Sequence, residues 1–318
     1  MTPTLEGIHH VTAVTADARR NLDFYRDTLG MRLVKKTVNQ DDVRAYHLFY
    51  ADAKGSPGTD LTFFDWPMAA PERHGTHSIA RTALRVAGGE DGMAWWRARL
   101  VAAGVRASDA SEVDGRLTLP FEDPEGQRLA LVDDDGAGDA HPWDASAVPA
   151  ERQVRGLGPI TLSVRDSRPT MAVLVELLGM RQVRSYRQEH GHEVLVASMA
   201  GGGPGAEVHV IAQPQLPPGR PGAGGVHHVA FRTRDEATHR GWLERLDAYR
   251  IPNSGQVDRF YFRSLYFREP NGILFEIATD GPGFDVDEPL ANLGEGLALP
   301  PFLEPRRADI EANLRPLA

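Results

Sequence analysis

One structural plan is repeated four times along the sequence, and this repeat constrains the fold more than any other feature. In the first copy, Gly7–Val14 alternates apolar, β-branched and polar residues as a strand does. A predicted helix follows over Ala18–Leu29, because Leu22, Tyr25 and Leu29 lie on one helical face and Gly30 can end it. Three strand-like stretches complete the copy: Arg32–Thr37, Arg44–Tyr50 and Asp60–Trp66.

The other three copies follow the same order. They begin near His77–Val86, Gly156–Val164 and Gly225–Phe231, and each is followed by a predicted helix and further strands. A single strand–helix–strand–strand–strand unit has a half-exposed sheet, whereas pairs of units can enclose a core. The sequence therefore predicts an α+β chain of four βαβββ modules in two domains. We place the domains at 1–145 and 152–283, with a tail at 284–318 that forms a short packed helix or a dimer arm.

Composition excludes several classes of function. The net charge of −9 comes without a basic stripe, so nucleic acid is not expected as a partner. The absence of cysteine excludes disulfides, thiolate metal sites and a cysteine nucleophile. The first ten residues do not resemble a signal peptide, and no apolar run approaches the ~20 residues of a membrane span. We therefore expect a cytoplasmic protein without membrane contact; the oligomeric state stays open.

Superposing the four copies brings out candidate metal ligands. The second histidine of each His-His pair, His10 and His228, matches Ser78 in the second copy and Pro159 in the third. In the last strands, Glu276 lies four residues after Gly272, and its counterparts by the same rule are Thr62, Ala130 and His209. The first and fourth copies thus offer His10, Thr62, His228 and Glu276, and the middle copies offer a poor metal set.

Two imidazoles and one carboxylate form a facial triad that suits iron(II) with open coordination positions, and manganese(II) fits the same ligands. Glu276 lies in an apolar strand, where a carboxylate needs a partner such as a metal. A strand histidine is more often a packed or surface residue than a ligand. His9 and His10 should point to opposite faces of their strand, so only one of them can face a given site. His47 and His209 stay as further histidines that can lie near a site.

The modules resemble the vicinal oxygen chelate superfamily, which includes glyoxalase I, bleomycin-resistance proteins and type I extradiol dioxygenases. The segment Asp258–Phe284, the opening Gly7–Thr12 and the ending Leu299–Arg307 resemble the hydroquinone ring-cleaving dioxygenases, and this likeness covers nearly the whole chain. The resemblance implies iron(II) held by His10, His228 and Glu276. It also implies that an aromatic diol and dioxygen are the partners.

The resemblance further implies site roles for His9, Thr12, His227, Arg259 and Tyr266. His227 or Tyr266 is the candidate acid/base group, Arg259 would stabilise anions, and His9 and Thr12 would orient ligands or substrate. A histidine expected upstream of Tyr266 in extradiol enzymes is absent, and Arg259 lies about there, which favours a para-diol over a catechol.

Two alternatives stay open. A glyoxalase-type isomerase or thiol-conjugating enzyme needs a fourth ligand, which Thr62 does not supply. A catalytically silent binding protein of the drug-resistance kind predicts an incomplete ligand set.

Overall fold

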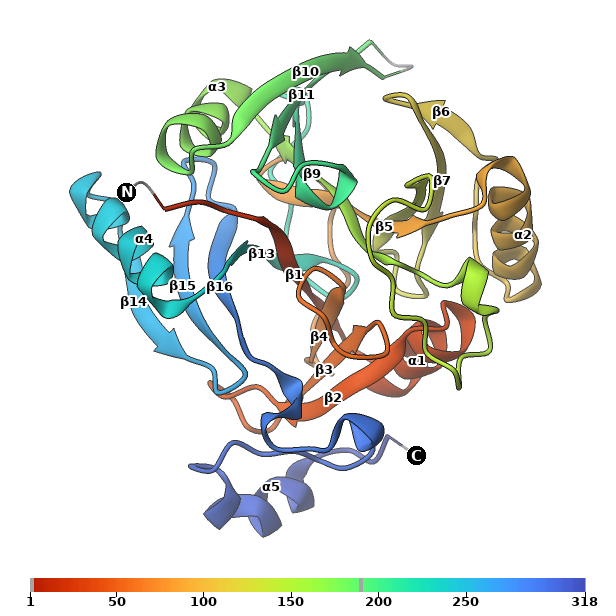
Figure 1. The fold of residues 1–318 in the computed structure, drawn as a ribbon, viewed down its shortest axis with the longest axis vertical. Helices are drawn as coiled ribbons and strands as arrows, with labels where there is room; N and C mark the ends of the chain where they lie inside the picture. The colour runs from red at the N-terminus through yellow and green to blue at the C-terminus, as the bar shows by residue number, and fades with distance from the viewer. Residues whose placement is uncertain (1–2, 189–190, 318) are drawn as a thin grey trace.

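The computed structural model describes residues 3–188 and 191–317 and contains the four βαβββ modules that the repeat predicts (Figure 1). The module helices are α1 (Ala18–Leu22), α2 (Gly89–Ala102), α3 (Ser167–Ala172) and α4 (Glu236–Ala248). α1 and α3 each continue as a wider π-helical turn, at Asp23–Thr28 and Val173–Leu177, which accounts for the longer helices predicted there. The side chains of Asp17, Asp166 and Asp235 accept backbone N–H groups at the starts of α1, α3 and α4.

The strands form two curled eight-stranded sheets, each from two modules. The first and fourth modules build the first sheet, in the order β14 (Asn253–Asp258), β15 (Phe262–Arg268), β16 (Leu274–Pro282), β13 (Val226–Thr233), β1 (Gly7–Thr15), β4 (Asp60–Asp65), β3 (Tyr46–Ala51), β2 (Arg32–Val38). The middle modules build the second sheet, in the order β10 (Arg181–Arg187), β11 (Glu193–Ser198), β12 (Glu207–Ala212), β9 (Gly156–Val164), β5 (Ser78–Val86), β8 (Arg128–Asp133), β7 (Arg116–Glu122), β6 (Ser111–Val113).

Modules that are distant in sequence thus share a sheet. β1 pairs antiparallel with β13, and β5 pairs antiparallel with β9. Neither 1–145 nor 152–283 closes a sheet by itself, although the proposed boundaries of those segments stay a prediction. The concave face of the first sheet is called the first cup below, and that of the second sheet the second cup.

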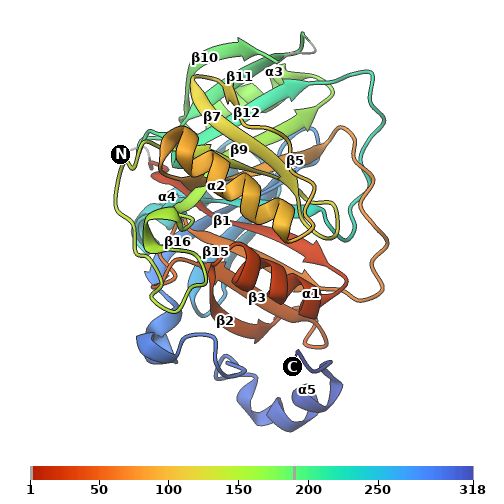
Figure 2. The same ribbon diagram turned by 90° about the vertical axis from the view of Figure 1, so that its right-hand side faces the viewer.

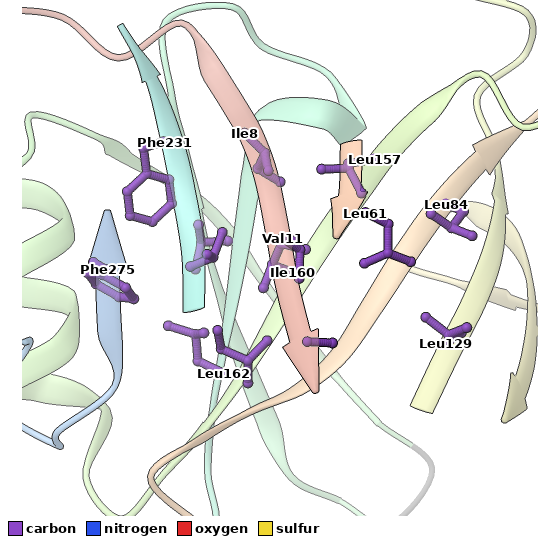
Figure 3. Packing of buried hydrophobic residues seen from close by; sticks show 14 of the residues in the cluster. Ile8, Val11, Leu61, Leu84, Leu129, Leu157, Ile160, Leu162, Phe231 and Phe275 are labelled. Atoms are coloured by element: carbon purple, nitrogen blue, oxygen red, sulfur yellow. The ribbon is translucent and has the colours of Figure 1, made fainter. Parts of the chain in front are cut away.

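The core lies between the two sheets, on the faces that point away from the cups. Figure 3 shows Ile8 and Val11 of β1 close to Leu157 and Ile160 of β9, with Phe231 and Phe275 to one side. These side chains are all buried.

The module helices lie in two pairs on the flanks of the sheets. The helix of the first module lies beside α2, and the helix of the third module lies beside α4. Figure 2 shows α1 and α2 on the same flank, where Arg99 of α2 donates to the carbonyl of Thr28 at 2.8 Å. Arg245 of α4 donates in the same way to the carbonyl of Leu177, at 2.6 Å. Within the described residues, no helix combines the length and the apolar character that crossing a bilayer requires.

The tail packs along β2 and ends in α5 (Arg307–Asn313), as the short-helix interpretation of the tail predicts (Figure 1). Lys35 of β2 is fully buried and forms ion pairs with Asp287, at 2.7 Å, and with Glu288. Leu299, Leu303 and Ile310 cover Val38. The tail therefore supports the strand that leads into loop 39–44, at the rim of the first cup.

Truncating a core side chain of α2 should destabilise the whole chain. Trp96 is fully buried, and its Nε1 donates to the carbonyl of Arg152. We expect Trp96→Ala to lower the free energy of unfolding by about 3–5 kcal/mol, measured by urea denaturation. Val101→Ala, on the exposed side of the same helix, is the control and should change it by less than about 0.5 kcal/mol. Equal effects from both changes would contradict this account of the core.

Candidate metal centre

The first cup is organised around the pairing of β1 with β13, which contains two β-bulges. Ile8 pairs with Phe231 and His10 with Ala230, so His9 is an extra residue on β1. Thr12 pairs with His228 and Ala13 with Val226, so His227 is an extra residue on β13. A bulge breaks the alternation of side chains. The expectation that His9 and His10 point to opposite faces was therefore wrong, and both rings lie beside Phe262 on the cup side.

The bulged His9 fixes the tautomer of His10. His9 Nε2 lies 3.1 Å from the carbonyl oxygen of Thr279, which can only accept, so this nitrogen carries the hydrogen. His9 Nδ1 then accepts from His10 Nδ1 at 2.9 Å. The lone pair of His10 Nε2 is left to face the cup, as metal ligation by a histidine requires.

The second pair repeats this arrangement. His227 Nδ1 lies 2.7 Å from His228 Nδ1, and the two rings meet edge to face. His227 packs against Phe64 and Trp66. With the same tautomer as in the first pair, His228 Nε2 also presents a lone pair to the cup.

Glu276 completes a set of converging ligand atoms. Its Oε2 lies 2.9 Å from His228 Nε2 and 3.2 Å from His10 Nε2, and the two Nε2 atoms are 3.3 Å apart. Oε2 is buried and makes no hydrogen bond of acceptable geometry to the described residues, whereas Oε1 accepts from Ser264 Oγ at 2.6 Å. Three lone-pair atoms this close repel one another unless they share a cation, so these residues fit a metal ion.

Electrostatics favour the protonation states that a metal requires. Burial opposes ionisation of Glu276, but His10 and His228 outweigh it and hold the pKa of this carboxyl well below its ordinary value. Burial, followed by the neighbouring His10, lowers the pKa of His9 to about 3. Burial, followed by His228, does the same for His227, to about 3. At neutral pH both of these histidines are therefore neutral.

A cavity opens over the three candidate ligands. It encloses an empty volume of about 450 Å³ with its mouth included, and its lining contains His10, His228, Arg259 and Tyr266. Arg259 donates to Tyr266 Oη at 3.3 Å and to Asp41 at 2.9 Å. Burial, followed by the charge of Glu276, raises the pKa of Tyr266, which keeps the phenol protonated.

The remaining predicted residues lie behind the lining. His9 and His227 contact the ligand histidines, and Thr12 Oγ1 lies 2.8 Å from Thr62 Oγ1. Of the two acid/base candidates, Tyr266 lines the cavity and His227 does not. Sequence reasoning left two residues of this site without a role. Ser264 orients Glu276, and His47 lines the cavity with its Nε2 2.9 Å from Thr62 Oγ1.

The second cup shows what the middle modules place at the equivalent positions. Strand register makes Pro159 the counterpart of His228, Ala130 that of Thr62 and His209 that of Glu276, as the sequence comparison predicts. The counterpart of His10 is Arg81 rather than Ser78, because Thr82 pairs with Ile160 as Val11 pairs with Val229, so the sequence comparison was three residues out of register.

The second cup holds a carboxylate cluster of its own. Asp114, Glu207 and His209 also bring their polar atoms together. Arg116 donates to both oxygens of Glu207, at 2.8 and 3.0 Å, and Arg184 pairs with both carboxylates. The two guanidinium groups already neutralise these acids, so the cluster is an ion-pair network.

Acid should destabilise the metal-free protein through the buried histidines. The pKa of His9 is about 3 in the folded protein against an ordinary value of 6.5, so below pH ~6.5 the unfolded chain binds a proton that the folded protein does not. The free energy of unfolding should therefore fall between pH 7 and 5. His9→Gln should reduce the slope by up to about 1.4 kcal/mol per pH unit in urea titrations. An unchanged slope would show that His9 protonates in the folded state.

Comparison with known proteins places the chain in a family. The model of the Glyoxalase/Bleomycin resistance protein/Dioxygenase superfamily matches residues 7–131 and 156–277. The Bacillus subtilis (strain 168) protein named "Putative ring-cleaving dioxygenase MhqA" is 49% identical over 98% of this chain and 99% of its own. The "Chlorohydroquinone/hydroquinone 1,2-dioxygenase" of Sphingobium indicum is 30% identical over 94% of this chain and 93% of its own.

Solved structures agree with this placement. The crystal structure of a "putative dioxygenase" from Bacillus subtilis subsp. subtilis str. 168 superposes with a TM-score of 0.91 at 35% identity, covering 99% of this chain and 98% of that one. Glyoxalase I from Zea mays shares the fold, with a TM-score of 0.63 at 15% identity over 86% of this chain and 92% of that one. The chain belongs to the Glyoxalase/Bleomycin resistance protein/Dioxygenase superfamily.

Proposed function

We propose that this chain is an iron(II)-dependent dioxygenase that opens the ring of a substituted hydroquinone between C1 and C2. Both atoms of one O2 molecule enter the product. The observation that carries the proposal is the convergence of His10 Nε2, His228 Nε2 and Glu276 Oε2 within 3.3 Å of one another, beneath a cavity of small-molecule size. The likeness to ring-cleaving dioxygenases along the whole chain supports the reaction class.

The ligand set distinguishes this proposal from the four-ligand isomerases. His10, His228 and Glu276 would hold the iron, and when bound it supplies open coordination positions and acidifies a phenolic hydroxyl. Thr62 stands where a fourth protein ligand would come from, and its hydroxyl is already hydrogen-bonded to Thr12 and His47. Manganese(II) fits the same three ligands.

The cavity lining suits a para-diol. A hydroquinone has only one hydroxyl within reach of the metal ligands, so its second hydroxyl must meet the protein elsewhere. Thr37, Asn39 and Gln40 line the same cavity and offer hydrogen-bonding groups away from the three ligands. Phe49, Phe64 and Phe262 provide the apolar walls for an aromatic ring.

Two lining residues supply a proton to the reacting oxygen and stabilise negative charge on the substrate. Tyr266 keeps its proton on Oη at neutral pH and lies over the cavity, so it is the proton donor to the reacting oxygen. Arg259 lies against Tyr266 and stabilises negative charge on the substrate. His9 and His227 hold the ligand imidazoles, and Thr12 holds Thr62.

Oxygen consumption tests the proposal directly. The protein is purified anaerobically and loaded with iron(II), and oxygen uptake is followed with methyl- and chlorohydroquinone. We expect one O2 consumed per hydroquinone, loss of the aromatic absorbance and a ring-opened acid as product. If the protein binds iron stoichiometrically but consumes no oxygen with either substrate, the proposal is wrong. Turnover of a thiol conjugate instead would favour the isomerase alternative.

Removing the carboxylate ligand should abolish iron binding. We expect Glu276→Gln to weaken iron(II) binding by more than about 100-fold, because even outer partners of a metal site contribute 10–100-fold. Metal analysis after desalting measures this. Glu207→Gln, in the ion-pair network of the second cup, is the matched control and should retain one iron per chain. Loss of iron from Glu207→Gln together with retained iron in Glu276→Gln would show that the metal site lies in the second cup.

Replacing the proton donor should slow turnover without loss of metal. We expect Tyr266→Phe to reduce kcat by about 100-fold, the lower range for general acid catalysis, with unchanged iron content. Tyr249→Phe is the control, since Tyr249 is half exposed and outside the cavity lining. Full activity of the Tyr266→Phe protein would show that another group supplies the proton.

A further inference from the structure

The first cup has an internal pseudo-twofold symmetry that singles out one side of the metal centre. Val11 pairs with Val229 at the centre of the β1–β13 ladder, so His10 and His228, each one residue earlier, are equivalent. Thr62 pairs with Thr12 of β1, and Glu276 pairs with Ala230 of β13, so Thr62 and Glu276 are equivalent. One half of the cup therefore supplies a carboxylate where the other half supplies a hydroxyl.

The same symmetry relates His47 to Ser264. Phe49 pairs with Thr62 and His47 with Phe64 in the first module, while Tyr266 pairs with Glu276 and Ser264 with Ala278 in the fourth. Ser264 Oγ donates to Glu276 Oε1 at 2.6 Å, and His47 Nε2 lies 2.9 Å from Thr62 Oγ1. In both halves of the cup, the residue at this equivalent position forms a hydrogen bond to the residue in the carboxylate or hydroxyl position: Ser264 to Glu276, and His47 to Thr62. On the Thr62 side, however, the orienting residue is a large ring that itself reaches the cavity.

His47 is held in a fixed orientation. Its ring lies between Phe49 and Phe64, with centroid distances of 4.0 and 4.4 Å. Thr62, its partner, is in turn bonded to Thr12 at 2.8 Å. Burial, followed by the nearby His10 and His228, lowers the pKa of His47 well below its ordinary value, so the ring is a neutral hydrogen-bonding group.

One nitrogen of His47 is left for a molecule in the cavity. Nε2 is bonded to Thr62, whereas Nδ1 makes no hydrogen bond to any residue that the structure describes. Most buried side-chain polar atoms have a hydrogen-bond partner in the protein or an ordered water, so a nitrogen without a protein partner is available to a molecule in the cavity. Here the second nitrogen belongs to a side chain that lines the cavity beside the slot that Thr62 leaves open.

We propose that His47, oriented by Thr62, hydrogen-bonds the small exogenous ligand that occupies the open Thr62 side of the metal centre. The ligand class is a diatomic such as dioxygen, which enters beside the aromatic substrate; in this respect the inference rests on the proposed function. His47 is thus a ligand-orienting residue, and Thr62 acts through it as a positioning residue.

Nitric oxide is the probe, because it binds iron(II) at an open position without any turnover. The full-length protein is loaded anaerobically with iron(II) and titrated with nitric oxide, and the adduct is followed by electron paramagnetic resonance. We expect His47→Phe, which fits between Phe49 and Phe64, to keep one iron per chain, weaken nitric oxide binding about three- to tenfold and change the spectrum. In turnover, the KM for oxygen should rise by a similar factor with an unchanged KM for the hydroquinone.

Three further variants separate the parts of this proposal. His47→Gln can keep the contact with Thr62 but lacks the free nitrogen, so it should behave like His47→Phe. Thr62→Glu places a carboxylate in the open slot, and it should bind iron more tightly, bind nitric oxide more weakly and change the spectrum of the adduct. His192→Gln, in the hairpin between β10 and β11 of the second sheet, should match the parent protein throughout.

The outcomes distinguish this inference from the proposed function. Parent-like nitric oxide affinity and spectra in both His47 variants would overturn the orienting role. Loss of iron from His47→Phe would overturn it as well, since His47 would then be a ligand. Parent-like nitric oxide affinity and spectrum in Thr62→Glu would show that the diatomic does not occupy the Thr62 side. A parent protein that binds nitric oxide but consumes no oxygen with hydroquinones would reject the dioxygenase activity alone.

Discussion

The antiparallel pairing of β1 with β13 is the contact on which the rest of the molecule depends. It joins the first and fourth modules into one sheet and leaves the middle modules to form the other. It also brings His10 within 3.3 Å of His228, although 218 residues separate them in the chain. Because these two candidate ligands lie on adjacent central strands, their spacing is set by the backbone ladder, and flexible loops do not contribute to it.

Two irregularities in this ladder convert a structural pairing into a candidate metal site. Each bulge adds one histidine, His9 or His227, which turns toward the following histidine and holds its Nδ1. A regular ladder would send these side chains to the opposite face, where they could not fix a tautomer. The two bulges leave backbone groups outside the ladder. In return, the imidazoles of His10 and His228 are oriented so that each presents a lone pair to the same point. Glu276, held by Ser264, adds the one carboxylate of the candidate ligand set.

Much of this arrangement could be predicted from the sequence because the four copies of the repeat can be aligned with one another. The module order, α4 and the set His10, His228 and Glu276 follow from periodicity and from comparing copies. Other features depend on information that no single segment contains. The directions of His9 and His227 depend on bulges, which break the alternation without a sequence signal, and the equivalence of Arg81 with His10 depends on the pairing of β5 with β9. The sequence singled out His47 as a histidine that can lie near a site, but its contact with Thr62 and its equivalence with Ser264 became recognisable only when β3 and β15 could be compared across the symmetry of the first cup.

The exchange of modules between the sheets has a consequence for how the protein is made. During synthesis, the strands of the middle modules leave the ribosome before β13 and β16 exist, and they can pair with each other across a short connection. The first module cannot pair until β13 of the fourth module has been synthesised, and pairing over such a sequence separation is slow. A chain that ends before β13 therefore contains His10 without His228 or Glu276. The three candidate ligands can therefore meet only in a chain that extends through β16.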